Sequence, residues 1–245
     1  MKRRLWTEEE VRKAVALYVQ TPFGKIHSGN PEIIQLALQI GRTPASVAYK
    51  LANLASLDET ISQSGMSHAS SLDREIWSEF FESLREESRQ IVIEKRDSAG
   101  FSDEGTSVYL YENPGSLDRF GITKLRSRQG LFRTMVLSAY DFKCAVTGIE
   151  QPELLVAGHI KPWSVEIERR LDPRNGICLN RLHDRAFDLG LITFEADGRM
   201  LVSPHMKHES RSKITQMGDA RLRMPRRFLP DQELLRYHRE NRFLA

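Results

Sequence analysis

Residues 154–190 constrain the fold of this chain more than any other part of its sequence. An apolar segment at 154–163 predicts a strand that Pro162 ends, and residues 164–174 form a polar loop. A tight turn then opens a second short strand at 175–180, and a helix follows at once over residues 181–188. This order of parts predicts a small ββα unit.

Three side chains that can take part in chemistry stand at defined points of this unit. His159 ends the first strand, Asn175 begins the second, and His183 lies in the helix. A neutral imidazole, with an ordinary pKa of about 6.5, is suited to take a proton from water near neutral pH. A divalent cation neutralises charge that builds on a phosphate and on its leaving oxygen. Phosphodiester hydrolysis needs both functions.

The unit resembles the HNH endonuclease family, in which a ββα fold holds one divalent metal ion. The resemblance covers residues 126–203 and is carried by AGHIKPW at 157–163 and DPRNGICLNRLHDRAFD at 172–188, with a similar lead-in, CAVTG, at 144–148. It points to the branch of the family without zinc-binding cysteines. The chain has only Cys144 and Cys178, which form no C-x-x-C pair, so no structural zinc is expected.

The resemblance implies a role for each of the three side chains. His159 would be the general base, Asn175 would hold the loop that orients this base, and His183 would bind the metal ion. The expected catalytic residues are therefore His159, Asn175 and His183, and the expected metal ligand is His183. The expected cofactor is Mg²⁺, with Mn²⁺ or Ni²⁺ as alternatives.

One position departs from the family pattern. Many members carry an acid immediately before the first histidine, where it helps to bind the metal, and this chain has Gly158 there. Asn180, Asp184 and Asp188 are nearby candidates for the missing ligand. On an ideal helix, Asp184 lies about 100° and Asp188 about 140° around from His183, so neither shares its face. The sequence leaves the choice open.

Residues 1–55 predict a compact module of three helices. Thr7 and Glu10 form a capping box, and Asn30-Pro31 and Thr43-Pro44 are helix starts. A helix, a glycine-containing turn and a second helix predict a helix-turn-helix module, and the opening resembles Myb-like three-helix domains. A plain helical scaffold is the alternative. If the module binds DNA, the polar side of its third helix carries Arg42, Ser46, Tyr49, Lys50 and Asn53.

The whole chain is predicted to be α+β, with the helical module first and the ββα nuclease domain near the C-terminus. Residues 56–125 are expected to hold a Ser-rich linker and a long amphipathic helix at about 72–95, with an exposed connection at 97–121. The nuclease domain is expected at 126–203. It includes a short strand at 143–148 and a hairpin that turns at Asp197-Gly198. A basic extension at 204–245 completes the chain.

The distribution of charge favours a polyanionic partner. The net charge is only +3, but residues 199–245 contain 11 Arg or Lys against 5 Asp or Glu. The Arg-rich run at 221–227 predicts either a phosphate clamp or a solvated surface. No apolar run is long enough for a signal peptide or a membrane span, so a cytoplasmic protein is expected, with no membrane partner.

These observations together predict a metal-dependent HNH endonuclease that hydrolyses DNA, with restriction or defence as its setting. RNA stays open as a substrate. A double-strand break generally needs two active sites, which a homodimer would supply. The alternative function is a non-catalytic DNA-binding regulator with a degenerate ββα domain, and the missing acid at Gly158 is its main support.

Overall fold

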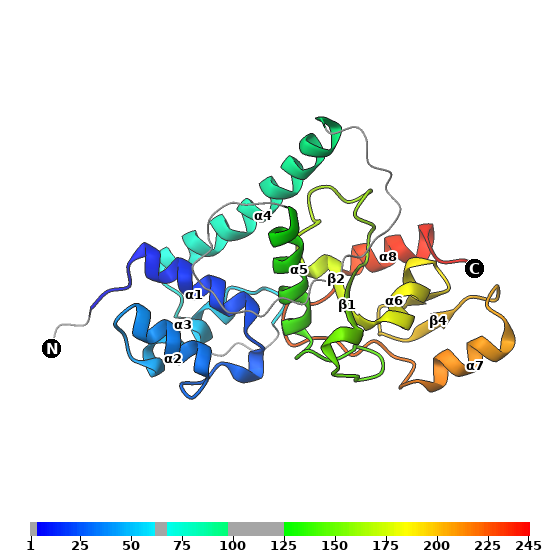
Figure 1. Ribbon diagram of the computed structural model, residues 1–245, viewed down its shortest axis with the longest axis horizontal. Coiled ribbons are helices and arrows are strands. Elements are labelled where there is room, and N and C mark those ends of the chain that lie inside the picture. The colour runs from blue at the N-terminus through cyan, green and yellow to red at the C-terminus, as the bar shows by residue number, and fades with distance from the viewer. Residues whose placement is uncertain (1–3, 62–67, 98–124) are drawn as a thin grey trace.

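The computed structural model describes residues 4–61, 68–97 and 125–245 (Figure 1). Helices form the N-terminal half, and a small ββα unit with further short strands and helices forms the C-terminal half, as the predicted α+β class requires. The Ser-rich part of the linker at 62–67, and nearly all of the connection expected at 97–121, lie outside the described residues.

Three helices begin where their capping residues predict. Helix α1 (Glu8–Gln20) carries the capping box of Thr7 and Glu10. The side chains of Asn30 and Thr43 accept hydrogen bonds from the first turns of α2 (Pro31–Gln39) and α3 (Pro44–Ala55). A short 3-10 turn, η1 (Phe23–Lys25), links α1 to α2. The apolar faces of the three helices enclose one core.

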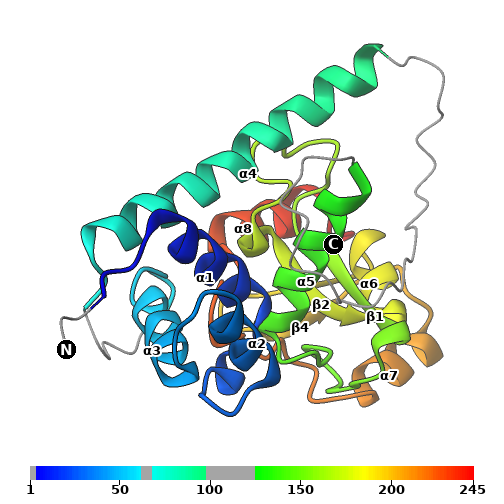
Figure 2. The same ribbon diagram turned by 60° about the vertical axis from the view of Figure 1, so that its left-hand side comes forward.

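The long helix α4 (Ser71–Asp97) confirms the amphipathic helix expected near residues 72–95 and runs beside α1 (Figure 2). Its first turn also covers α3, because the ammonium group of Lys50 lies 2.6 Å from Asp73 Oδ1. Asn53 is buried too, and Arg42 is bound to Glu10. Three of the five side chains expected to face DNA are therefore occupied within the protein, while Ser46 is half-buried and Tyr49 exposed, and the Myb-like resemblance is not supported.

The ββα unit consists of β1 (Leu155–His159), β2 (Gly176–Asn180) and α6 (Arg181–Asp188), and α5 (Leu125–Ala139) packs on its other side. The strands are antiparallel, with His159 opposite Gly176 and Leu155 opposite Asn180. A Cβ at Gly176 would lie 2.3 Å from a methyl carbon of Val136 in α5, so only glycine permits this close packing. The hairpin is therefore held between α5 and α6.

Shorter elements complete the C-terminal half. The 3-10 turns η2 (Pro152–Leu154) and η3 (Pro173–Asn175) precede β1 and β2. The hairpin of β3 (Ile192–Phe194) and β4 (Met200–Val202) turns at Asp197-Gly198 as predicted. The strand expected at 143–148 is absent from these described residues, which form a turn closed by a 2.9 Å bond from Gly148 N to Cys144 O.

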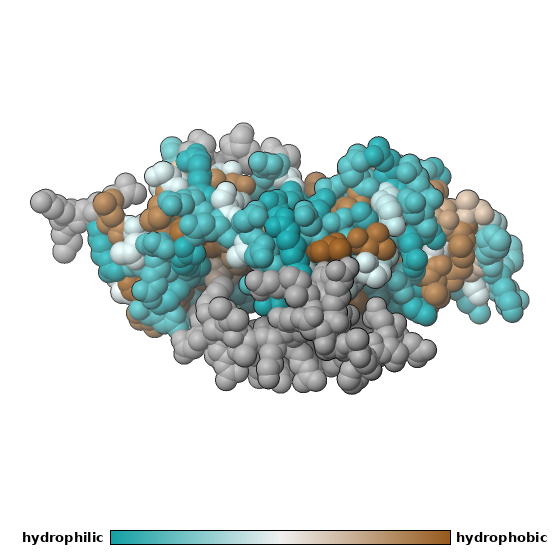
Figure 3. Space-filling model, turned by 90° about the horizontal axis from the view of Figure 1, so that it is seen from above, coloured by the Kyte–Doolittle hydropathy of each residue, from teal (hydrophilic) through white to brown (hydrophobic). Residues whose placement is uncertain are grey.

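The C-terminal residues form α7 (His208–Gln216) and α8 (Gln232–Asn241), and α8 packs against β3. In α8, the His238 ring stacks on Phe187 of α6 with 3.6 Å between centroids, and its Nδ1 lies 2.9 Å from the Thr193 hydroxyl. The face shown in Figure 3 is mainly hydrophilic, with small scattered apolar areas. Within the described residues, no helix has the length and apolar character needed to cross a membrane.

Arg227 joins the two halves of the molecule. Its side chain is 0% exposed, and its guanidinium donates to the backbone oxygens of Tyr18 and Val19 in α1. It also donates to Ser138 Oγ in α5 at 2.8 Å. A buried charge is tolerated only where hydrogen bonds replace its hydration, so this junction fixes α1 against α5.

We predict that Arg227→Met lowers the free energy of unfolding by about 2–4 kcal/mol, because it leaves buried carbonyl groups without donors. Urea denaturation measures this change. The neighbouring Arg226→Met is the matched control, since Arg226 is exposed and should shift stability by no more than about 0.5 kcal/mol. Equal effects of the two substitutions would contradict the role of the junction.

Candidate active site

His159 is held between aromatic rings at the end of β1. Its imidazole stacks on Phe132 of α5, with 4.2 Å between centroids and 4° between planes. Trp163 approaches at 5.4 Å and 82°, edge to face. Contacts from two elements therefore fix the orientation of this half-buried ring.

The hydrogen bond of His159 shows which ring nitrogen carries the proton. Its Nε2 lies 2.9 Å from the backbone oxygen of Arg170. A carbonyl oxygen only accepts, so Nε2 donates, and the lone pair of the neutral ring is on Nδ1. Burial lowers the pKa of His159 to about 4, although the bond to the Arg170 carbonyl opposes this shift. The imidazole is therefore neutral at pH 7.

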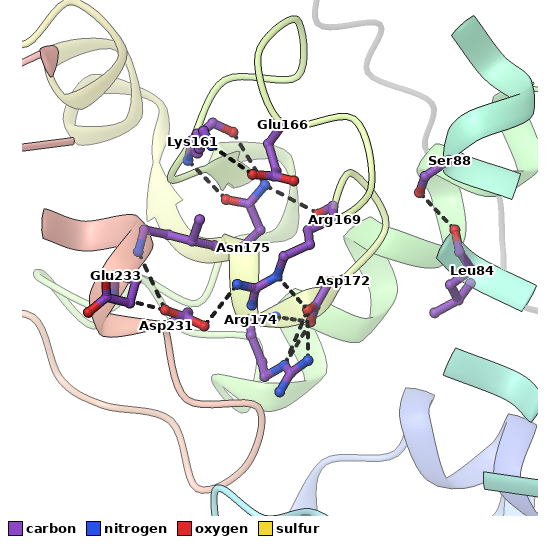
Figure 4. A network of polar contacts seen from close by, with 11 residues as sticks. Leu84, Ser88, Lys161, Glu166, Arg169, Asp172, Arg174, Asn175, Asp231 and Glu233 are labelled. Atoms are coloured by element: carbon purple, nitrogen blue, oxygen red, sulfur yellow. Dashed lines mark hydrogen bonds and ion pairs between the residues drawn. The ribbon is translucent and has the colours of Figure 1, made fainter. Parts of the chain in front are cut away.

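Asn175 ties together the loop that carries Arg170. It is fully buried, and its Oδ1 accepts a hydrogen bond from Lys161 N at 2.9 Å. Its Nδ2 donates to the backbone oxygens of Lys161 and Arg169, both at 3.3 Å (Figure 4). The amide thus connects both ends of the loop to the head of β2.

Ion pairs hold the same loop from outside. Asp172 accepts from Arg169 and Arg174, and Arg169 also reaches Asp231, the residue that caps α8, at 2.9 Å (Figure 4). Within the loop, the Arg170 guanidinium donates to the Trp163 carbonyl at 2.7 Å. The backbone oxygen that orients His159 therefore belongs to a rigid segment.

His183 lies at the other end of the hairpin. Its backbone N donates to Asn180 Oδ1 at 2.9 Å, and its Nδ1 is 3.1 Å from the same oxygen. Asn180 pairs with Leu155, four residues from the His159 end, which is about 13 Å at the usual rise of a strand. His183 therefore contacts Asn180, the residue that pairs with Leu155 at the end of β1 away from His159.

The His183 ring is in an apolar and enclosed position. It is 0% exposed, and its Nε2 is buried without a hydrogen bond. Burial lowers the pKa of His183, and the backbone of Ile214 in α7 is close enough to oppose that shift. This ring sits at the contact between the start of α6 and α7.

Asp184 occupies the space that Gly158 leaves open. A Cβ at Gly158 would lie only 2.3 Å from Asp184 Oδ1, so the carboxylate lies directly over this backbone position. His159 is the next residue along β1. Successive strand side chains point to opposite faces, so the Asp184 carboxylate lies on the α6 face of the hairpin and the His159 ring on the α5 face, where it stacks on Phe132.

The positive charge of Arg185 only partly offsets the burial of the Asp184 carboxylate. The described residues give it no ion pair and no hydrogen bond, and Asp188, one helical turn further on, is instead paired with Arg185 at 2.9 Å. Burial raises the pKa of Asp184 to about 6, and the negative charge of Asp188 adds to the effect. An unpaired carboxylate in a half-buried place is suited to a cation.

The donor set fits a hard divalent ion that keeps part of its hydration. Mg²⁺ is usually held by one or two carboxylates, waters and substrate phosphates, whereas a fully enclosed site needs more protein ligands. No group of three or more His, Cys, Asp or Glu able to hold a metal occurs among the described residues. Asp184 is thus the carboxylate that could bind such an ion, while Asp188 one turn away is paired with Arg185.

His183 and Asp184 are neighbours in α6, but their side chains point in different directions. Successive helical residues point about 100° apart, so His183 faces Asn180 and Ile214 while Asp184 faces β1. The sequence alone gives this angle but not which of the two side chains faces the strand. The informative signal was Gly158, because a missing side chain makes room for a group from another element.

The family comparison identifies the part of the chain that carries these residues. A family model described as HNH endonuclease matches residues 144–195, a range that contains β1, the loop, β2, α6 and β3. A comparison with curated proteins found no match. Residues 144–195 of this chain are therefore an HNH endonuclease domain.

Proposed function

We propose that this protein is a metal-dependent endonuclease that hydrolyses phosphodiester bonds in DNA, with His159 as general base and Asp184 as metal ligand. The observation that carries the proposal is the neutral His159 imidazole, oriented by the Arg170 carbonyl inside the matched HNH domain, with the Asp184 carboxylate over Gly158 on the α6 face of the same hairpin. His183, the ligand expected from the sequence, is replaced in this role by its neighbour.

Each residue of the site has a defined task in this proposal. His159 Nδ1 takes a proton from the attacking water, while the Arg170 carbonyl stabilises the positive ring that results. Asn175 keeps the loop, and with it that carbonyl, in place. A divalent cation, when bound, supplies Lewis-acid stabilisation of the phosphate charge. Asp184 would hold that cation.

Two features support nucleic acid as the substrate and hydrolysis as the reaction. The domain match implies a nuclease, and several exposed cations of the C-terminal half have no acidic partner. The acid that is absent at position 158 is supplied from α6, which removes the main argument for a degenerate regulator. DNA cleavage in restriction or defence is the setting we propose.

We predict that His159→Ala slows cleavage of supercoiled plasmid by about 10²- to 10⁴-fold, because the general base is lost. Gel assays with Mg²⁺, Mn²⁺ or Ni²⁺, on modified and unmodified plasmid, measure nicked and linear products. DNA binding should persist in this variant. His27→Ala, which removes an exposed histidine of the N-terminal half, is the matched control and should cut like the parent.

Two outcomes of that assay would count against the proposal. A His159→Ala variant that cuts at the parental rate would show that another group is the base. A parent that binds DNA and cuts with none of these ions would favour the non-catalytic regulator, and preferential cleavage of RNA would change the substrate.

We predict that Asp184→Asn stabilises the metal-free protein at pH 7.5 while it abolishes metal binding. The folded pKa of about 6 lies above the ordinary value of 3.8, so ionisation is disfavoured in the folded state. This penalty grows between about pH 4 and pH 6 and then stays constant, at up to about 3 kcal/mol. The neutral amide of the variant avoids it.

Thermal unfolding in EDTA and with added Mg²⁺ or Mn²⁺ measures both effects. The metal should raise the parental Tm, less so as pH falls below about 6, and should leave Asp184→Asn unchanged. Asp197→Asn is the control, since Asp197 is exposed and paired with Arg221. A metal-induced shift that survives in Asp184→Asn would exclude Asp184 as a ligand.

A further inference from the structure

Helix α7 has almost no contact with the rest of the protein through its side chains. Of its nine residues, only Ile214 is buried. Lys207 at its N-cap, and Arg211 and Lys213 within it, are all exposed. A short helix that is polar nearly all round gains little from packing, so its exposed charges call for a separate explanation.

The basic side chains of α7 are unusual in this protein because they have no partner. In the part of the chain whose side chains are described, five Lys or Arg side chains have no ion pair, hydrogen bond or ring contact with the protein, and three of these lie within seven residues. The five are Lys25, Lys207, Arg211, Lys213 and Arg226. Glu209 is the one acidic residue of α7.

Neighbouring arginines show the contrast. Arg221 pairs with Asp197 at 3.2 Å, and Arg223 pairs with Asp219 at 2.7 Å. Arg227 is buried in the junction with α1. The Arg-rich run at 221–227, considered above as a phosphate clamp, therefore has most of its charges occupied within the protein.

The position of α7 connects it to the proposed site. The backbone of Ile214 lies against His183 at the start of α6, and α6 carries Asp184 on its next residue. A polyanion that contacts the Asp184 end of α6 therefore passes close to α7. Lys207 and Arg211 lie about 40° apart around a helix and Lys213 about 120° from Lys207, so the three charges project from more than one side of α7.

We propose that Lys207, Arg211 and Lys213 bind the phosphate backbone of the duplex that the nuclease domain cuts. This inference rests on the proposed function, because it takes DNA as the polyanion. Phosphate contacts of this kind position a duplex and strengthen its binding without reading its sequence. They act on affinity and leave the chemical step to His159 and Asp184.

The test combines binding and cleavage by a variant with Lys207→Gln, Arg211→Gln and Lys213→Gln. Binding of a short duplex is measured in the His159→Ala background at several salt concentrations. Each lost phosphate contact should lower the slope of log K against log salt by about 0.9, so the slope should fall by about 2 to 3. With His159 present, KM for the duplex should rise while kcat stays at the parental value.

The matched control replaces the other two unpartnered cations, Lys25→Gln and Arg226→Gln, and should leave the slope unchanged. Glutamine keeps high helix propensity, and circular dichroism checks that the fold is retained. A second variant with Lys207→Arg and Lys213→Arg keeps the charges and should bind like the parent, which separates charge from any loss of structure.

Three results would overturn the inference. An unchanged salt slope in the triple variant would show that α7 does not touch DNA. An equal fall per charge in the control would show a general effect of net charge. A parent that neither binds nor cuts DNA would also remove the proposed function, whereas a parent that cuts normally beside an unaffected triple variant removes only the role of α7.

Discussion

The buried amide of Asn175 is the interaction on which the proposed site depends. Its three hydrogen bonds hold Lys161 and Arg169, near the two ends of one loop, against the head of β2. That loop supplies the Arg170 carbonyl, which decides the tautomer of His159. Because an amide has both an acceptor and two donor hydrogens, no single hydrophobic or acidic side chain could replace all three bonds.

The second constraint is the close approach of α6 to β1 at Gly158. Gly158 has no side chain, and the carboxylate of Asp184 fills the volume that a Cβ would need. In the proposed site, an acid on the helix would take the place of the acid that many family members carry on the strand. The missing side chain at Gly158 makes room for the charged side chain of Asp184, so a substitution at either position affects the other.

Much of this arrangement follows from local sequence rules. The capping residues Thr7, Asn30 and Thr43 predicted three helix starts, and the ββα order predicted the hairpin and α6, because these depend on neighbours in the chain. The burial of Lys50 by Asp73, and the meeting of Gly158 with Asp184, depend on contacts between distant segments. A single sequence fixes the angle between His183 and Asp184 but not the rotation of α6 on the sheet.

Burial acts on the two central groups of the site in different ways. It lowers the pKa of His159 to about 4, which keeps the base neutral and able to accept a proton at physiological pH. It raises the pKa of Asp184 to about 6, so a proton and a metal ion compete for this carboxylate just below neutral pH. The acid limit of metal binding should then be set by Asp184, since His159 stays neutral over the range in which Asp184 loses its charge.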